Sequence, residues 1–154
     1  MPPKRAGPSL EISFFAHVTE DHEKVIRAAK NLLTVEVSRD IVFHQSQMKG
    51  YFGNPITIYR CKVQGEGKIN AILGSISARL GEIEKEGLLR EIDRHLDEAR
   101  NLYLRFDKQA ACLDSVKLSL SDPIHMRLRL PAVRGSRKEL LEVLRNVGLL
   151  PSEA

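Results

Sequence analysis

Five basic residues and no acidic residue lie in the stretch from Pro123 to Lys138: Arg127, Arg129, Arg134, Arg137 and Lys138. A guanidinium group binds phosphate through two parallel hydrogen bonds, so this stretch is suited to a polyanion. The whole chain carries 24 basic and 20 acidic residues, and its net charge of +4 is too small to establish such a ligand. The local pattern is therefore the strongest electrostatic signal in the sequence.

Alternation of apolar and polar residues predicts that these charges lie on a sheet. From Ile124 to Leu130 every second residue is apolar, which is the period of a strand with one buried side. Residues 102–106 and 116–120 alternate in the same way, so we predict three strands. If the strands share a sheet, their polar sides form one basic face that contains an aromatic ring: Tyr103, Arg105, Lys117, Ser119, His125, Arg127 and Arg129.

Such a face suits RNA, because arginines contact phosphates while an aromatic ring or a guanidinium plane stacks on an unpaired base. Arg134, Arg137 and Lys138 follow in a predicted loop and first helical turn, where free backbone N–H groups also attract phosphate. We expect them to extend the RNA-binding site. One alternative is a solvated sheet face with no ligand, although such faces usually mix both charges. Another is a docking surface for an acidic protein, such as a ribonuclease or ribosomal subunit.

The remaining pattern predicts an α+β fold. We expect a strand over residues 10–18, a helix over 20–33 with Thr19 as its N-cap, strands over 36–47 and 56–63, and two helices within 66–96. Ser136 and Glu139 form a capping box that begins a last helix. These elements predict a flexible tail over residues 1–8 and a single α+β domain over residues 9–150.

Two groups of aromatic residues admit different readings. Tyr51 and Phe52 lie in the glycine-containing loop 49–55 beside Lys49, where they either stack on bases or form a hairpin turn whose Phe52 packs into the core. Phe15 and His17 fall on the polar side of the first strand, where we expect a neighbouring element to cover them.

No motif in the sequence indicates catalysis, a cofactor or a metal. Gly65-Glu66-Gly67-Lys68 lacks the full phosphate-binding loop pattern, and no nucleophile-elbow motif presents a serine. The histidines show neither a paired spacing nor cysteine neighbours nor predicted convergence with carboxylates: His17, His22, His44, His95 and His125. We therefore expect a protein that is not an enzyme.

The sequence also favours a cytoplasmic location. Cys61 and Cys112 lie far apart and form no Cys-x-x-Cys pair, so reduced thiols are the simplest interpretation. No apolar run approaches the roughly 18 residues that span a bilayer, and the N-terminus lacks the apolar core of a signal peptide. We expect no membrane association.

Several segments resemble one known family. Leu102-Tyr103-Leu104-Arg105-Phe106-Asp107-Lys108-Gln109-Ala110-Ala111, followed by Asp122-Pro123-Ile124, resembles the signature of an archaeal family described as RNA-binding proteins and predicted exosome subunits. Residues 12–18 and 53–56 agree as well, and the resemblance extends from about residue 9 to 147. Cys112 and Asp114 depart from the small or aromatic residue and the glycine expected in relatives, which affects the local turn.

The resemblance implies a fold similar to the ribosomal protein that carries 5S RNA, which is an open mixed or antiparallel sheet with helices packed on one face. It implies a non-catalytic RNA-binding accessory factor in RNA processing or degradation, or in ribosome-related RNA metabolism. The partners implied are RNA and components of the exosome, ribonuclease P or the ribosome, but not DNA. The resemblance also places Asp107 as the cap of a short helix, with Lys108 and Gln109 near the strand end where RNA or a partner meets them.

Overall fold

The computed structural model describes residues 7–50, 52–130 and 136–152. Its strands are β1 (Ser9–His17), β2 (His44–Lys49), β3 (Pro55–Gln64), β4 (Leu102–Phe106) and β5 (Ile124–Arg129). Its helices are α1 (His22–Asn31), α2 (Val35–Asp40), α3 (Glu66–Arg79), α4 (Glu82–Arg90), the 3₁₀ helix η1 (Ile92–His95), α5 (Lys108–Cys112) and α6 (Arg137–Asn146). The predicted tail over residues 1–8 lies mostly outside the described residues.

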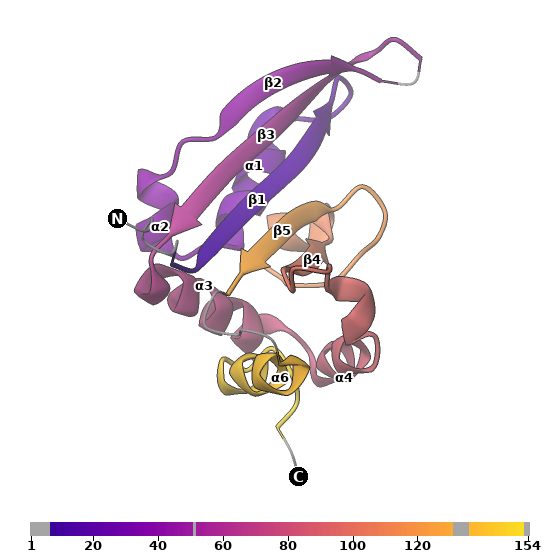
Figure 1. The fold of residues 1–154 in the computed structure, drawn as a ribbon. Coiled ribbons are helices and arrows are strands. Elements are labelled where there is room, and N and C mark those ends of the chain that lie inside the picture. The colour runs from indigo at the N-terminus through magenta and orange to yellow at the C-terminus, as the bar shows by residue number, and fades with distance from the viewer. Residues whose placement is uncertain (1–6, 51, 131–135, 153–154) are drawn as a thin grey trace, which may run out of the picture.

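The strands form one open antiparallel sheet in the order β2-β3-β1-β5-β4. The central strand β1 pairs with β3 along its whole length, but with β5 only from Ser9 to Ser13. Beyond Ser13, the β5 side of β1 is therefore left without a strand partner. Figure 1 shows β2 and β3 extending as a long ribbon past the shorter β5 and β4.

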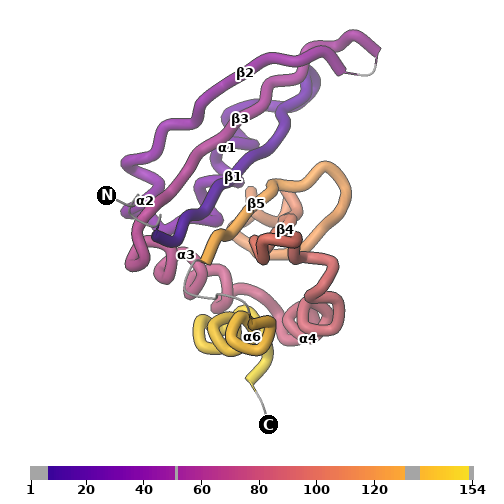
Figure 2. The backbone as a smooth tube through the Cα atoms, viewed as in Figure 1, coloured from indigo at the N-terminus to yellow at the C-terminus, as the bar shows by residue number. Residues whose placement is uncertain are grey.

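One side of the sheet is buried by the helices and the other faces solvent. Leu10, Ile12, Phe14 and Ala16 of β1 are fully buried, as the period of two requires for one side of a strand. Helical residues such as Ala29 on α1 and Ile72 on α3 complete the same core cluster. Figure 1 shows α1 behind the sheet and α3, α4 and α6 towards one of its ends, and the tube in Figure 2 shows the front of the sheet uncovered.

Most of the predicted elements are confirmed. The structure contains β1, β3, β4, β5, α1, α3 and α4 where periodicity predicted them. Ser136 caps α6, because its hydroxyl accepts a hydrogen bond from the Glu139 N–H at 3.3 Å. None of the described helices is both long and apolar enough to cross a membrane.

Two predicted strands and one predicted cap are wrong. Residues 36–40 are helical, because the Thr34 hydroxyl caps α2 by accepting the Val37 N–H at 3.3 Å, and β2 begins only at His44. Residues 116–120 form only an isolated bridge from Leu118 to Phe106, since the Leu118 N–H donates to a Glu84 carboxylate oxygen at 2.8 Å. The cap of α1 is Asp21 rather than Thr19.

Candidate nucleic-acid interface

The register of the sheet collects basic side chains from three strands on its solvent side. Glu11 lies between Lys62 on β3 and Arg127 on β5, and Tyr103 on β4 continues that row. The next row runs from Arg60 through Ser13 and His125 to Arg105. We call the cationic part of this surface the basic half of the open face: Arg60, Lys62, Arg105, His125, Arg127 and Arg129.

The positive charge of the basic half is not neutralised within the described part of the chain. Its arginine and lysine side chains form no ion pair with any described residue. Among the residues of the five strands, Glu11 is the only acidic one. A surface with this excess of unpaired cations attracts a polyanion.

The Tyr103 side chain is fixed at the edge of the basic half. Its hydroxyl donates a hydrogen bond to Asp97 at 3.0 Å, and Asp97 also accepts the Asn101 N–H at 2.8 Å. Burial raises the pKa of Tyr103, as do the hydrogen bond and charge of Asp97, while Arg127 opposes the shift. The hydroxyl therefore stays protonated near neutral pH, and the hydrogen bond holds the ring in place.

Lys117 and Ser119 lie beside this surface although their segment is not a strand. The Ser119 N–H donates to the Arg105 carbonyl at 2.9 Å, and the Lys117 carbonyl accepts the Asp107 N–H at 2.8 Å. With Arg105 and His95 they line a cavity of about 520 Å³ next to α4. The predicted neighbours are thus brought together by a loop.

Lys108 does not lie on the basic half. Its ammonium donates to Asp122 at 2.8 Å, to Glu20 at 3.2 Å and to the Phe15 carbonyl at 2.6 Å, and its side chain is only 12% exposed. These partners already satisfy its three N–H groups, so the geometry does not favour the predicted RNA contact. Gln109 is exposed on α5, and the predicted Asp107 cap is present, since its carboxylate accepts the Ala110 N–H at 2.8 Å.

His17 lies beside the ion pairs that Lys108 forms with Glu20 and Asp122. A ring nitrogen of His17 lies 3.1 Å from Asp122, and ligand atoms of His17, Glu20 and Asp122 all lie within 4.8 Å of one another. The expectation that no histidine converges with carboxylates is therefore wrong for His17. These three side chains have the chemistry to hold a metal ion, but the Lys108 ammonium already supplies a positive charge there. We call His17, Glu20, Lys108 and Asp122 the ionic cluster.

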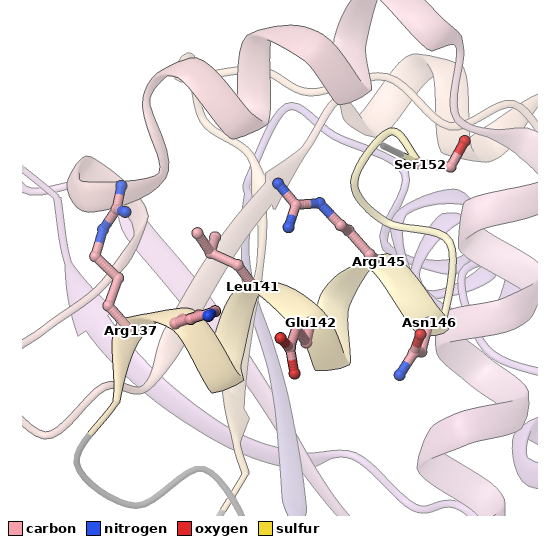
Figure 3. A pocket seen from close by; sticks show the side chains of 7 residues that line it. Arg137, Leu141, Glu142, Arg145, Asn146 and Ser152 are labelled. Carbon is pink, nitrogen blue, oxygen red and sulfur yellow. The ribbon is translucent and has the colours of Figure 1, made fainter. Parts of the chain in front are cut away.

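The predicted residues at the start of α6 lie on a second surface. Arg134 lies outside the described residues, whereas Arg137 and Lys138 are exposed in the first turn of α6. Arg137 pairs with Asp93 at 3.0 Å. Figure 3 shows Arg137, Leu141 and Arg145 projecting from the same side of α6, where they help to line a cavity of about 1060 Å³.

Sequence comparison identifies the family. The model of a family described as RNA binding matches residues 9–130. The chain belongs to this family. RNA-binding protein PAB1135 of Pyrococcus abyssi is 32% identical over 144 residues, covering 92% of this chain and 94% of that protein. The resemblance to an archaeal RNA-binding family is thereby confirmed.

Two solved structures of archaeal proteins share the fold. AF2318 of Archaeoglobus fulgidus is 29% identical with a TM-score of 0.76, covering 90% of this chain and 97% of that one. Mth689 of Methanothermobacter thermautotrophicus is 26% identical with a TM-score of 0.73, covering 90% and 96%. Both are described as DUF54 proteins.

Sequence reasoning missed Arg60 and Lys62, which the structure places in the basic half. Both residues alternate with the buried Tyr59, Cys61 and Val63 along β3, so the period of two already put them on the polar side of that strand. Arg60 lies opposite Ser13 and Lys62 lies opposite Glu11, on the side of β1 away from β5. This placement depends on the strand order of the sheet. Strand order is a long-range property that local periodicity does not contain.

The aromatic side chains also differ from expectation. Phe15 is 38% exposed on the open face, so the expectation that a neighbouring element covers it is wrong. Phe52 is 88% exposed, which excludes the reading in which it packs into the core. Tyr51 of the same loop lies outside the described residues.

Proposed function

We propose that this protein binds RNA through the basic half of the open face. The observation that carries the proposal is the gathering of unpaired cations from β3, β4 and β5 on one uncovered sheet surface. Membership of a family described as RNA binding supports the nature of the ligand. Arginines that lie this close together donate hydrogen bonds to the oxygens of successive phosphates along an RNA backbone.

The chemistry of the interface is electrostatic attraction and hydrogen bonding, with no covalent step. Arg and Lys side chains that neutralise phosphates release the counterions condensed on the nucleic acid, so affinity falls steeply with salt. Neutralising roughly five phosphates of a single strand gives a log–log salt slope of about −3.5. The Glu11 carboxylate lies between Lys62 and Arg127 and repels phosphate at that point. It therefore separates the phosphate positions on either side of it.

The test is a double substitution, Arg127→Ala with Arg129→Ala, in the full chain. We expect a loss of affinity for total cellular RNA and a salt slope that is shallower by about 1.4, since two phosphate contacts are removed. The control is Lys24→Ala with Arg39→Ala, which removes the same charge from exposed positions on α1 and α2. Parental affinity and slope in a folded Arg127/Arg129 variant would place the RNA elsewhere.

We further propose an accessory, non-catalytic role in RNA processing or degradation, or in ribosome-related RNA metabolism. The support is the resemblance to predicted exosome subunits, which makes ribonuclease and ribosomal components the natural partners to test. Tagged protein recovered with such components after nuclease treatment supports the role. If the protein recovers an acidic partner but has no RNA affinity of its own, the basic half is a protein-docking surface instead.

A further inference from the structure

The open face contains an apolar region next to the basic half. Along β3, Arg60 and Lys62 give way to Ile58 and then Ile56 towards the β2–β3 turn. Ile58 is the direct partner of Phe15 on β1, and Ile56 is the partner of Met48 on β2. We call Phe15, Ile56, Ile58 and Met48 the apolar half of the open face.

Phe15 is the central side chain of the apolar half. The β1–β5 register stops at Ser13, so Phe15 has a strand partner on its β3 side only, and its ring remains 38% exposed. Two residues of a strand span about 7 Å, so the row of Phe15 lies next to the row of Arg60, Ser13 and His125. An exposed ring and unpaired cations are thus adjacent on one surface.

The ionic cluster borders Phe15 on the side where β5 no longer pairs with β1, since Lys108 donates to the Phe15 carbonyl and His17 lies two residues further along β1. Glu20 and Asp122 contribute two negative charges there, and Lys108 contributes one positive charge. The carboxylates of the cluster outnumber its lysine, so phosphates are attracted to the basic half rather than to this border. The open face therefore has a direction, with a place for phosphates at one end and for apolar rings at the other.

We infer that the RNA bound here is single-stranded, with an unpaired base stacked on Phe15 and its flanking phosphates over Arg60, Arg127 and their neighbours. This inference rests on the proposed function and specifies its substrate class. A duplex encloses the faces of its bases, whereas a single strand offers them to an aromatic ring. Ile58 and Met48 add apolar contact around the base without reading its sequence.

The test compares two RNAs, a labelled single-stranded oligonucleotide and a blunt duplex of the same sequence. The variants are Phe15→Leu, which keeps an apolar side chain, and Phe15→Ala. Leu113→Ala is the control, because Leu113 is an exposed apolar residue outside the sheet. Thermal unfolding verifies that each variant is folded. A single-stranded oligonucleotide containing 2-aminopurine reports stacking directly through the quenching of its fluorescence.

We expect the parent protein to bind the single strand more tightly than the duplex. Loss of one stacked base lowers single-strand affinity by about 5- to 150-fold in the Phe15 variants, while duplex affinity and the Leu113 control stay unchanged. Quenching of 2-aminopurine is expected with the parent and lost with Phe15→Leu.

Two results would overturn the inference and they are distinguishable. If folded Phe15 variants bind the single strand like the parent while the Arg127/Arg129 variant binds weakly, the proposed function stands and the stacking assignment fails. If the parent binds neither RNA at low salt, both fail, and an acidic, apolar protein segment becomes the occupant to seek.

Discussion

On the open face of the sheet, His125 of β5 lies directly opposite Arg105 of β4. Burial lowers the pKa of His125, and the positive charge of Arg105 lowers it further, against an opposing effect of Asp122. The ordinary pKa of histidine is about 6.5, so this imidazole is neutral at pH 7. The charge of the basic half at neutral pH therefore comes from arginine and lysine, and it rises when His125 takes up a proton.

RNA affinity is expected to increase on acidification. Phosphate favours the protonated imidazole, so the dissociation constant at fixed salt should fall about two- to fivefold between pH 7.5 and 5.5. The measurement is a binding titration at each pH for the parent and for His125→Gln. His125→Gln removes this imidazole alone, so the difference between the two pH profiles isolates His125. Identical pH profiles for the two proteins would contradict this assignment.

The stability of the free protein is expected to change in the opposite direction. The pKa of His125 is lower in the folded chain than in the unfolded chain, so unfolding takes up a proton in the window between the two values. The free energy of unfolding therefore decreases as the pH falls through about 6.5 and below. Urea unfolding at pH 7.5 and 5.5 should show a smaller loss for His125→Gln than for the parent; an equal loss excludes His125 as its source.

Arg60 and Lys62 are expected to contribute to RNA binding as much as Arg127 and Arg129 do. They lie on the other side of β1, Lys62 in the row of Arg127 and Arg60 in the row of Arg105, and they too lack ion-pair partners in the described ranges. The double variant Arg60→Ala, Lys62→Ala should reduce the magnitude of the salt slope by about 1.4. Filter binding across a salt series measures it. An unchanged slope would confine the interface to β4 and β5.

Local periodicity predicted much of this fold because most elements have one clearly buried side. It failed at 116–120, where Val116, Leu118 and Leu120 alternate as a strand would. Leu120 is 84% exposed and the Leu118 N–H binds Glu84 instead of a strand. The alternation therefore did not reflect one common buried face. This is clear only from the position of α4, whose Glu84 accepts the Leu118 N–H.

The candidate site was predictable only where its parts are close in sequence. Arg105, Arg127 and Arg129 were found because β4 and β5 are neighbours both along the chain and in the sheet. The ion pairs of Lys108 were not predicted, because its partners, Glu20 and Asp122, come from other segments. Contacts of that kind follow from the assembled topology, which a pattern read along one strand does not encode.

Gly148 and Gly74 are expected to respond in opposite ways to substitution by alanine. Gly148 ends α6 with a φ of 91°, and an added Cβ would lie 3.1 Å from the Ser77 Cβ, so Gly148→Ala should cost about 1–2 kcal/mol of stability. Gly74 lies within α3 with open space around it, so Gly74→Ala should stabilise by about 0.5–1 kcal/mol. Chemical denaturation measures both. Equal effects would contradict the left-handed cap at Gly148.

Lys108 is expected to support the fold rather than to contact RNA. Lys108→Ala leaves two carboxylates and the Phe15 carbonyl without their shared donor, and because both carboxylates are partly exposed the loss should be about 1–2 kcal/mol. Lys138→Ala, at an exposed position of α6, should change stability by less than about 0.5 kcal/mol.

Urea unfolding and RNA titration of the folded variants separate the structural role of Lys108 from a role in RNA binding. Since the ammonium faces the carboxylates and not the basic half, RNA affinity should stay near that of the parent; unchanged stability with a clear loss of RNA affinity would instead restore the contact that the sequence predicted.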